Sequence, residues 1–153
     1  MTRYLLDTNI ISNVTKPLPF EPLLEWMAEQ TDESLFISSL SLAEIWRGIL
    51  EKPAGKKRRE LEEWFSGTEG PQGLFRGRVL PFDENAALIW GHLMAAGNTA
   101  GRPRSALDMV IAAIAQSNDC VLVTDNERHF PDIDLLNPLR DAKTLRPPKS
   151  TQR

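Results

Sequence analysis

Short apolar runs alternate with longer amphipathic stretches along this chain, and this alternation is the feature that most limits its fold. The runs at 3–6, 35–38 and 121–124 are four residues long, and VLVT has the continuous apolar character of a strand buried on both faces. Further strands are expected at 78–82 and 133–136. Strands that alternate with helices predict an α/β fold, a three-layer α/β/α sandwich around a mainly parallel sheet of four or five strands.

The helices are predicted from apolar residues at helical spacing, with prolines, glycines and capping residues at the boundaries. They are expected at 10–14, at 22–30, from Ser41 to about 51, at 56–65, after Asp83 and after Ser105. The glycine-rich segment 67–77 and the polar segment 97–104 are expected to be loops.

The length of 153 residues favours one domain. We expect one α/β domain at 1–139 and a basic, disordered tail at 140–153, which is rich in Pro, Lys and Arg. The single cysteine, Cys120, has no partner for an internal disulfide, and no signal peptide or membrane-length apolar run is present. These features predict a cytoplasmic protein with no membrane association.

Four acidic residues are expected to meet at one edge of the sheet. Asp7 ends the first strand and Asp125 ends the VLVT strand, which places both at the carboxyl edge. Glu44 is predicted in the first turn of the helix that follows the second strand. Asp108 is predicted in the first turn of a helix that runs antiparallel to VLVT. In a parallel sheet all four therefore reach the same rim, where open α/β sheets bind ligands.

Carboxylates gathered without matching cations repel one another, and a divalent metal ion removes that repulsion and can activate water. Hard oxygen ligands favour Mg²⁺ or Mn²⁺. Each acid also has a purely structural interpretation. Ser41-x-x-Glu44 and Ser105-x-x-Asp108 resemble capping boxes, and the two aspartates that end strands can be turn formers.

Other functional classes find little support in the sequence. It contains no phosphate-binding loop, dinucleotide fingerprint or zinc-ligand spacing. The two histidines, His92 and His129, accompany no nucleophile motif, although His129 lies close enough to Asp125 to touch a substrate. The net charge of −3 does not indicate nucleic-acid binding, but the basic residues at 56–59, at 76–78 and at 102–104 are candidate phosphate contacts.

At these residues the chain resembles the PIN-domain ribonucleases, in particular VapC-type toxins of toxin–antitoxin pairs. The matching pieces run in family order from about 3 to 139: YLLDTNIIS, FISSLSLAEIWRGI, GRVLPFDENAALIWGHL, SALDMVIAAIAQ, VLVTDNERHF and LNPL. The resemblance implies metal-dependent endonucleolytic cleavage of RNA, with Asp7, Glu44 and Asp108 as the first three acids. Asn126 occupies the position of the family's common fourth acid, and we assign that role to Asp125 instead.

In this interpretation Asp7 and Asp108 bind the principal ion, while Glu44 and Asp125 complete the shell, hold a second ion or orient the attacking water. The polar residues beside these acids are candidate support for the site: Thr8, Asn9, Thr124 and Asn126.

The resemblance also implies a small cognate antitoxin as a partner, and large apolar residues on short helices predict a homodimer. The helices at 22–30 and from Ser41 to about 51 are expected to form a clip for an amphipathic antitoxin segment. The large apolar residues on which the homodimer prediction rests are Leu23, Leu24, Trp26, Met27, Ile45, Trp46, Ile49, Leu50, Leu61, Trp64 and Phe65.

Two alternatives remain open at this stage. One is a metal-dependent phosphatase with Asp7 as nucleophile, although Asn9 stands where such enzymes usually carry a second aspartate. The other is an inactive PIN-like module that only binds a partner.

Overall fold

The computed structural model describes residues 1–14 and 18–138. The elements, in chain order, are β1 (Arg3–Leu6), α1 (Thr8–Val14), α2 (Glu21–Ala28), η1 (Asp32–Ser34), β2 (Leu35–Ser38), α3 (Ser39–Leu50), α4 (Lys56–Ser66), α5 (Pro71–Leu74), β3 (Val79–Leu80), α6 (Glu84–Thr99), α7 (Ala106–Ser117), β4 (Cys120–Val123), η2 (Glu127–His129) and β5 (Leu135–Leu136).

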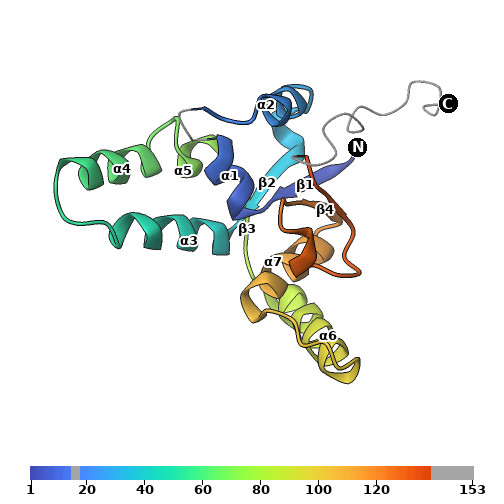
Figure 1. Cartoon of the computed structure of the whole chain (residues 1–153). Helices are drawn as coiled ribbons and strands as arrows, with labels where there is room; N and C mark the ends of the chain where they lie inside the picture. The colour runs from blue at the N-terminus through green and yellow to red at the C-terminus, as the bar shows by residue number, and fades with distance from the viewer. Residues whose placement is uncertain (15–17, 139–153) are drawn as a thin grey trace.

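A five-stranded sheet in the order β3-β2-β1-β4-β5 forms the centre of the molecule (Figure 1). Every neighbouring pair is parallel, with Leu6 opposite Ile37 on one side and Val123 on the other. All strands therefore end at the same edge, and the predicted parallel α/β sheet is confirmed.

Helices cover both faces of this sheet, because successive strand side chains point to opposite sides. Leu5 and Leu122 pack with α6 and α7 in one core cluster, whereas Leu6 and Val123 pack with α1 and α2 in the other. Figure 1 shows these helix pairs on opposite sides of the strands. The predicted three-layer sandwich follows from this alternation of buried residues.

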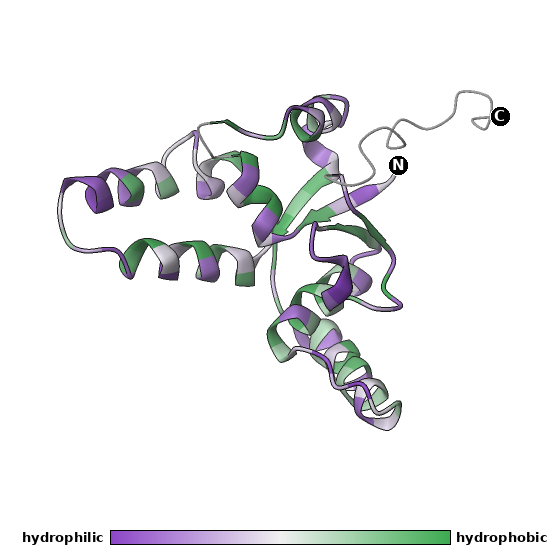
Figure 2. Cartoon of the chain, in the orientation of Figure 1, coloured by the Kyte–Doolittle hydropathy of each residue, from purple (hydrophilic) through white to green (hydrophobic). Residues whose placement is uncertain are grey.

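Helices α3 and α4 extend side by side away from the sheet and form an arm (Figure 1). The sheet is mostly hydrophobic, whereas the first turns of α4 are mostly hydrophilic (Figure 2). Trp46 of α3 packs on Phe65 of α4, with 4.9 Å between the ring centroids. The arm is thus held by aromatic contacts near its base, while its outer turns face solvent.

The predicted start of α3 is wrong by two residues. The helix begins at Ser39, and the Ser38 side chain is the N-cap that accepts a hydrogen bond from the Ser41 amide at 3.0 Å. Glu44 therefore lies in the second turn and not in the first, so Ser41-x-x-Glu44 is not a capping box. By contrast, Ser105 does cap α7, and it accepts a hydrogen bond from the Asp108 amide.

Several further boundaries differ from expectation, among them those of β3 and of the 67–77 segment. Strand β3 has only two residues instead of five, since Pro81 has no N–H for the ladder and β2 ends at Ser38. The expected 67–77 loop contains the short helix α5. Here a Cβ on Gly70 would lie 1.7 Å from the Trp64 carbonyl oxygen, so this approach of α5 to the end of α4 requires glycine.

Within the described ranges, none of the helices combines the length and apolar character needed to cross a bilayer. The proposed tail at 140–153 lies outside the described residues.

Candidate active site

Asp7 lies at the carboxyl end of the central strand and is 5% exposed. Its backbone amide continues the ladder to Val123, which fixes the side chain at the rim. The Asp7 Oδ1 atom accepts a hydrogen bond from the Thr8 amide at 2.8 Å. The Oδ2 atom accepts from the Thr124 hydroxyl at 2.9 Å and from the Asn9 amide group at 3.2 Å. Both carboxylate oxygens are therefore held in place by neighbours from α1 and from the residue that follows β4.

Glu44 reaches the same rim from α3, because Thr8 at the start of α1 contacts α3. The Thr8 hydroxyl donates to Glu44 Oε1 at 2.5 Å and lies 2.8 Å from the hydroxyl oxygen of the fully buried Ser41. Although Glu44 is one turn further along its helix than predicted, these contacts hold its carboxylate beside Asp7.

Asp108 reaches the rim from the first turn of α7. Its Oδ2 atom lies 3.1 Å from His129 Nδ1 on η2, and the two side chains are 26% and 56% exposed. The sequence analysis named His129 only as a possible substrate contact. The structure shows that it is a direct neighbour of one of the four acids.

Asp125 and Asn126 follow the buried Thr124 and form the fourth side of the rim. The Asp125 amide donates to Asn9 Oδ1 at 3.4 Å, and the Asn126 amide donates to the Thr124 hydroxyl at 3.0 Å. Asp125 is half-buried and Asn126 is exposed. The turn is thus fixed by backbone contacts that leave both side chains available at the rim.

All four acids line one pocket of about 440 Å³ at this edge, as expected. Within the described residues, however, no three of them lie close enough together to form a group that could hold one metal ion. The predicted support residues Thr8, Asn9 and Asn126 line the pocket as well, whereas Thr124 lies beneath it and holds Asp7. The complete lining consists of Asp7, Thr8, Asn9, Ser12, Asn13, Glu44, Asp108, Asp125 and Asn126. No basic side chain is among these residues.

This concentration of acids affects ionisation of the buried one. Burial raises the pKa of Asp7 to about 6, although hydrogen bonds from Thr124 and Thr8 oppose the change, and the negative charges of Asp108 and Glu44 raise the pKa further. The repulsion expected from the sequence is therefore present. A cation in the pocket would stabilise the ionised form of Asp7.

Ser12, Asn13 and Ser41 contribute to the site but were not singled out from the sequence. Ser12 follows Thr8 by four residues, and Asn13 follows Asn9 by four. Residues four apart share one face of a helix, so this spacing was the signal that could have found the first two. Ser41 had no such signal, since its role depends on the contact between α1 and α3.

Comparisons with known proteins agree with this architecture. The family model described as PIN domain matches residues 4–136. The VapC ribonuclease Y4jK of Sinorhizobium fredii is 34% identical over 140 residues, which cover 90% of this chain and 99% of that protein. Toxin FitB of Neisseria gonorrhoeae is 34% identical over 139 residues, again covering 90% and 99% of the two chains.

Solved structures give the same result. The crystal structure of FitAcB from Neisseria gonorrhoeae aligns with a TM-score of 0.82 at 33% identity, covering 89% of this chain and 98% of that chain. The structure of DNA-bound VapBC from Salmonella typhimurium aligns with a TM-score of 0.68 at 30% identity, with the same coverage. The family model spans most of the chain and the similarity extends over nearly the full length of these relatives, so the chain belongs to the PIN domain family.

Proposed function

We propose that this protein is a metal-dependent endoribonuclease that hydrolyses RNA phosphodiesters and acts as the toxin of a toxin–antitoxin pair. The observation that carries the proposal is the single pocket lined by Asp7, Glu44, Asp108 and Asp125 at the carboxyl edge of the sheet. The names of the relatives support it, because they include VapC ribonucleases, a toxin and tRNA(fMet)-specific endonucleases.

The pocket offers donors that suit Mg²⁺ or Mn²⁺, namely carboxylate, hydroxyl and amide oxygens with no thiol or imidazole among its lining residues. Buried Asp7, with its raised pKa, lacks a compensating cation among these residues. In the part of the chain that the structure describes, no three His, Cys, Asp or Glu side chains are close enough together to hold a metal ion between them. Mg²⁺ in proteins commonly binds one or two carboxylates and keeps several waters.

In the proposed mechanism Asp7 and Asp108 are the principal metal ligands, directly or through water. When bound, the metal polarises the phosphate and lowers the pKa of the attacking water. Glu44 and Asp125 complete the ligand shell or orient that water. Thr8 holds the Glu44 carboxylate, and Thr124 and Asn9 hold that of Asp7, so the donors are positioned before substrate arrives.

The phosphatase alternative receives no support. Asn9, in place of a second aspartate, donates to Asp7 Oδ2, and both Asp7 oxygens already accept hydrogen bonds. The names of the relatives, VapC ribonuclease and tRNA(fMet)-specific endonuclease, favour RNA cleavage instead.

The proposal is tested by incubating the purified full chain with total cellular RNA, with Mg²⁺ or Mn²⁺ and with chelator. The wild type should cleave only with metal, and Asp7→Asn and Asp108→Asn should each lose nearly all activity. Asp134→Asn is the matched control, because Asp134 is exposed and precedes β5 at the opposite edge of the sheet. A correctly folded wild type that cleaves no RNA with either metal would favour the inactive binding module instead.

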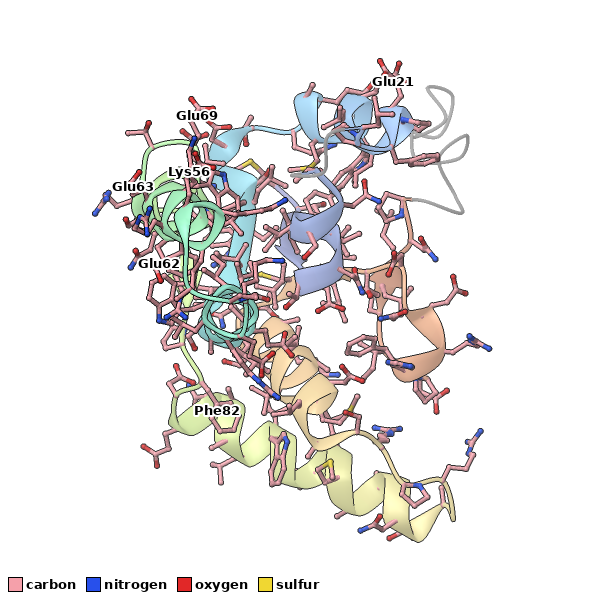
Figure 3. All side chains as sticks on the ribbon, turned by 60° about the vertical axis from the view of Figure 1, so that its left-hand side comes forward. Glu21, Lys56, Glu62, Glu63, Glu69 and Phe82 are labelled. Atoms are coloured by element: carbon pink, nitrogen blue, oxygen red, sulfur yellow. The ribbon has the colours of Figure 1, made fainter. Side chains whose placement is uncertain are left out.

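An antitoxin is the proposed protein partner, and solved VapBC and FitAB complexes among the structural relatives support this part. The helices at 22–30 and 41–51 do not form the predicted clip, since Figure 1 shows α2 and α3 apart with α1 between them. The structure instead has a groove of about 410 Å³ between α3 and α4, with Trp46, Phe65 and Glu62 in its lining. Figure 3 shows Glu62 on α4, where its carboxylate is paired with Arg58 at 2.9 Å, so the aromatic side chains are the main feature of the groove. An amphipathic segment could place its apolar face against Trp46 and Phe65.

A homodimer also stays a proposal, but fewer apolar side chains are exposed to form its interface than the sequence indicated. Leu23, Trp26, Ile49 and Phe65 are buried within the chain itself, because α2 closes one face of the sheet and the arm closes on itself. Other large apolar side chains are more than a third exposed and remain available: Leu24, Trp46, Leu50, Leu74, Phe82, Leu88 and Leu107. Light scattering at micromolar concentration should give twice the chain mass. A monomer would contradict the homodimer proposal.

The proposed reaction also requires a compartment that contains RNA, in line with the predicted cytoplasmic location.

A further inference from the structure

A second pocket, of about 530 Å³, lies against the acidic pocket and has the opposite charge. Asp108 lines both pockets. The remaining charged lining of the second pocket is basic: Arg102, Arg104, Arg128 and His129. His129 is bound to the shared Asp108, so the two pockets meet at this pair.

The four basic residues have two different roles. Arg104 is mostly buried, with 12% of its side chain exposed, and it lies 3.9 Å from Asp132 while donating to the Leu93 carbonyl. It therefore ties the α6–α7 loop to the segment that follows η2. Arg102 and Arg128 are exposed, and within 1–14 and 18–138 neither guanidinium has a hydrogen-bond or ion-pair partner.

The backbone at both exposed arginines is held in place by neighbouring contacts. The Arg102 amide donates to the Gly97 carbonyl at 2.9 Å, and a Cβ on Gly97 would lie 2.9 Å from the Arg102 carbonyl oxygen. Gly101 has φ +72°, which closes this turn without strain. On the other wall, Arg128 lies in η2, two residues before the almost fully buried Phe130. Two free cations are thus presented across one pocket from anchored segments.

We infer that Arg102 and Arg128 bind a backbone phosphate of the RNA next to the scissile one, which lies in the acidic pocket. The inference rests on the proposed function. A polynucleotide needs a cation-binding pocket at the bond to be cut and an anion-binding pocket beside it, and the shared Asp108–His129 pair places the two in contact. Guanidinium groups suit phosphate because they can bind it in bidentate fashion. Such contacts fix the position of the strand without reading its sequence.

The test measures binding separately from cleavage. In an Asp7→Asn background, the affinity for a fluorescein-labelled single-stranded RNA is followed by fluorescence anisotropy as salt is raised. Arg102→Gln and Arg128→Gln should each weaken binding several-fold, and the double variant should reduce the slope of log affinity against log salt by about 0.7, the contribution of one phosphate contact. Arg76→Gln is the matched control. The sequence made Arg76 a candidate phosphate contact, but the structure places it, exposed, before β3 at the opposite edge of the sheet and in the lining of neither pocket. It should leave affinity within about twofold of the background protein, since it contacts no phosphate in this pose.

Cleavage by the same substitutions in the otherwise wild-type chain gives a second readout. KM should rise while kcat changes little, because these residues contact substrate away from the reacting atoms. If wild type cleaves RNA and the double variant Arg102→Gln/Arg128→Gln binds and cleaves like Arg76→Gln, the assignment of a phosphate to the second pocket is wrong and the proposed function stands. If the wild type neither cleaves nor binds RNA, the proposed function fails and the phosphate assignment with it. Unchanged RNA affinity with weakened retention of a co-expressed antitoxin would also overturn the inference, in favour of a protein ligand.

Discussion

Replacing Asp7 with asparagine is expected to make the protein more stable at neutral pH, although it removes a proposed metal ligand. The folded-state pKa of Asp7 is about 6, and the ordinary value is 3.8. This difference corresponds to about 3 kcal/mol, the free energy by which folding disfavours the ionised carboxylate. Because the side chain is 5% exposed, solvent screens little of this cost.

Asparagine cannot reproduce every hydrogen bond of the carboxylate. Its carbonyl oxygen can accept from the Thr8 amide, but its amide group then faces Asn9 and the Thr124 hydroxyl, where a donor meets donors. The loss costs about 1 kcal/mol. The expected net gain for Asp7→Asn is therefore about 2 kcal/mol well above pH 6.

The gain must depend on pH in a defined direction. Between the unfolded and folded pKa values the native wild type binds more protons than the unfolded chain, so its free energy of unfolding falls as pH rises through this window. The Asp7→Asn variant has no ionisable group at this position, so its free energy of unfolding does not fall for this reason as pH rises. Its advantage should be near zero or slightly negative at about pH 4 and should reach its full value above about pH 7.

Urea denaturation of both proteins, in chelator, at several pH values across this window measures the effect. Asp134→Asn is the control for a carboxylate lost at the opposite edge of the sheet, and it should show no such pH dependence. Mn²⁺ at pH 7 should then stabilise the wild type and leave Asp7→Asn almost unchanged, since only a native protein that binds the ion gains from it. An advantage that is the same at all pH values, or a variant less stable than wild type at neutral pH, would refute the reasoning.

Three other outcomes are expected. Asp125→Ala should reduce Mn²⁺ affinity, measured by calorimetry, more than Asn126→Ala does, because a carboxylate binds a hard cation more tightly than an amide; a larger loss at Asn126 would reverse the assignment of the fourth ligand. Arg78 donates to the carbonyls of Asp32, Leu35 and Leu74, so Arg78→Gln should lower the free energy of unfolding by about 2–4 kcal/mol in urea, whereas Arg76→Gln should change it by less than about 0.5. Trp46→Ser should weaken retention of a co-expressed antitoxin in a pull-down while leaving RNA cleavage intact, because Trp46 lines the groove of the arm and not the acidic pocket; unchanged retention would place the antitoxin elsewhere.

The sequence by itself determined the strands and the edge to which the acids belong. The runs at 3–6 and 35–38 are strands with the predicted bounds, and VLVT is β4 shifted by one residue. Apolar strands and helix caps depend on neighbours in sequence, so local patterns suffice to place Asp7, Asp108 and Asp125 at the ends of their elements. A parallel sheet then brings those ends together.

Only the tertiary structure decided which side chains touch. Ser38 replaces Ser41 as the cap of α3, and Thr8 reaches Glu44 from another helix. The groove lies between α3 and α4, and Arg102 meets Arg128 across a pocket although they are distant in sequence. These contacts depend on the separation and rotation of packed elements, which periodicity does not encode. A raised pKa at Asp7 likewise requires burial and the nearby charges of Glu44 and Asp108 from two other segments, and these come together only once the chain has folded.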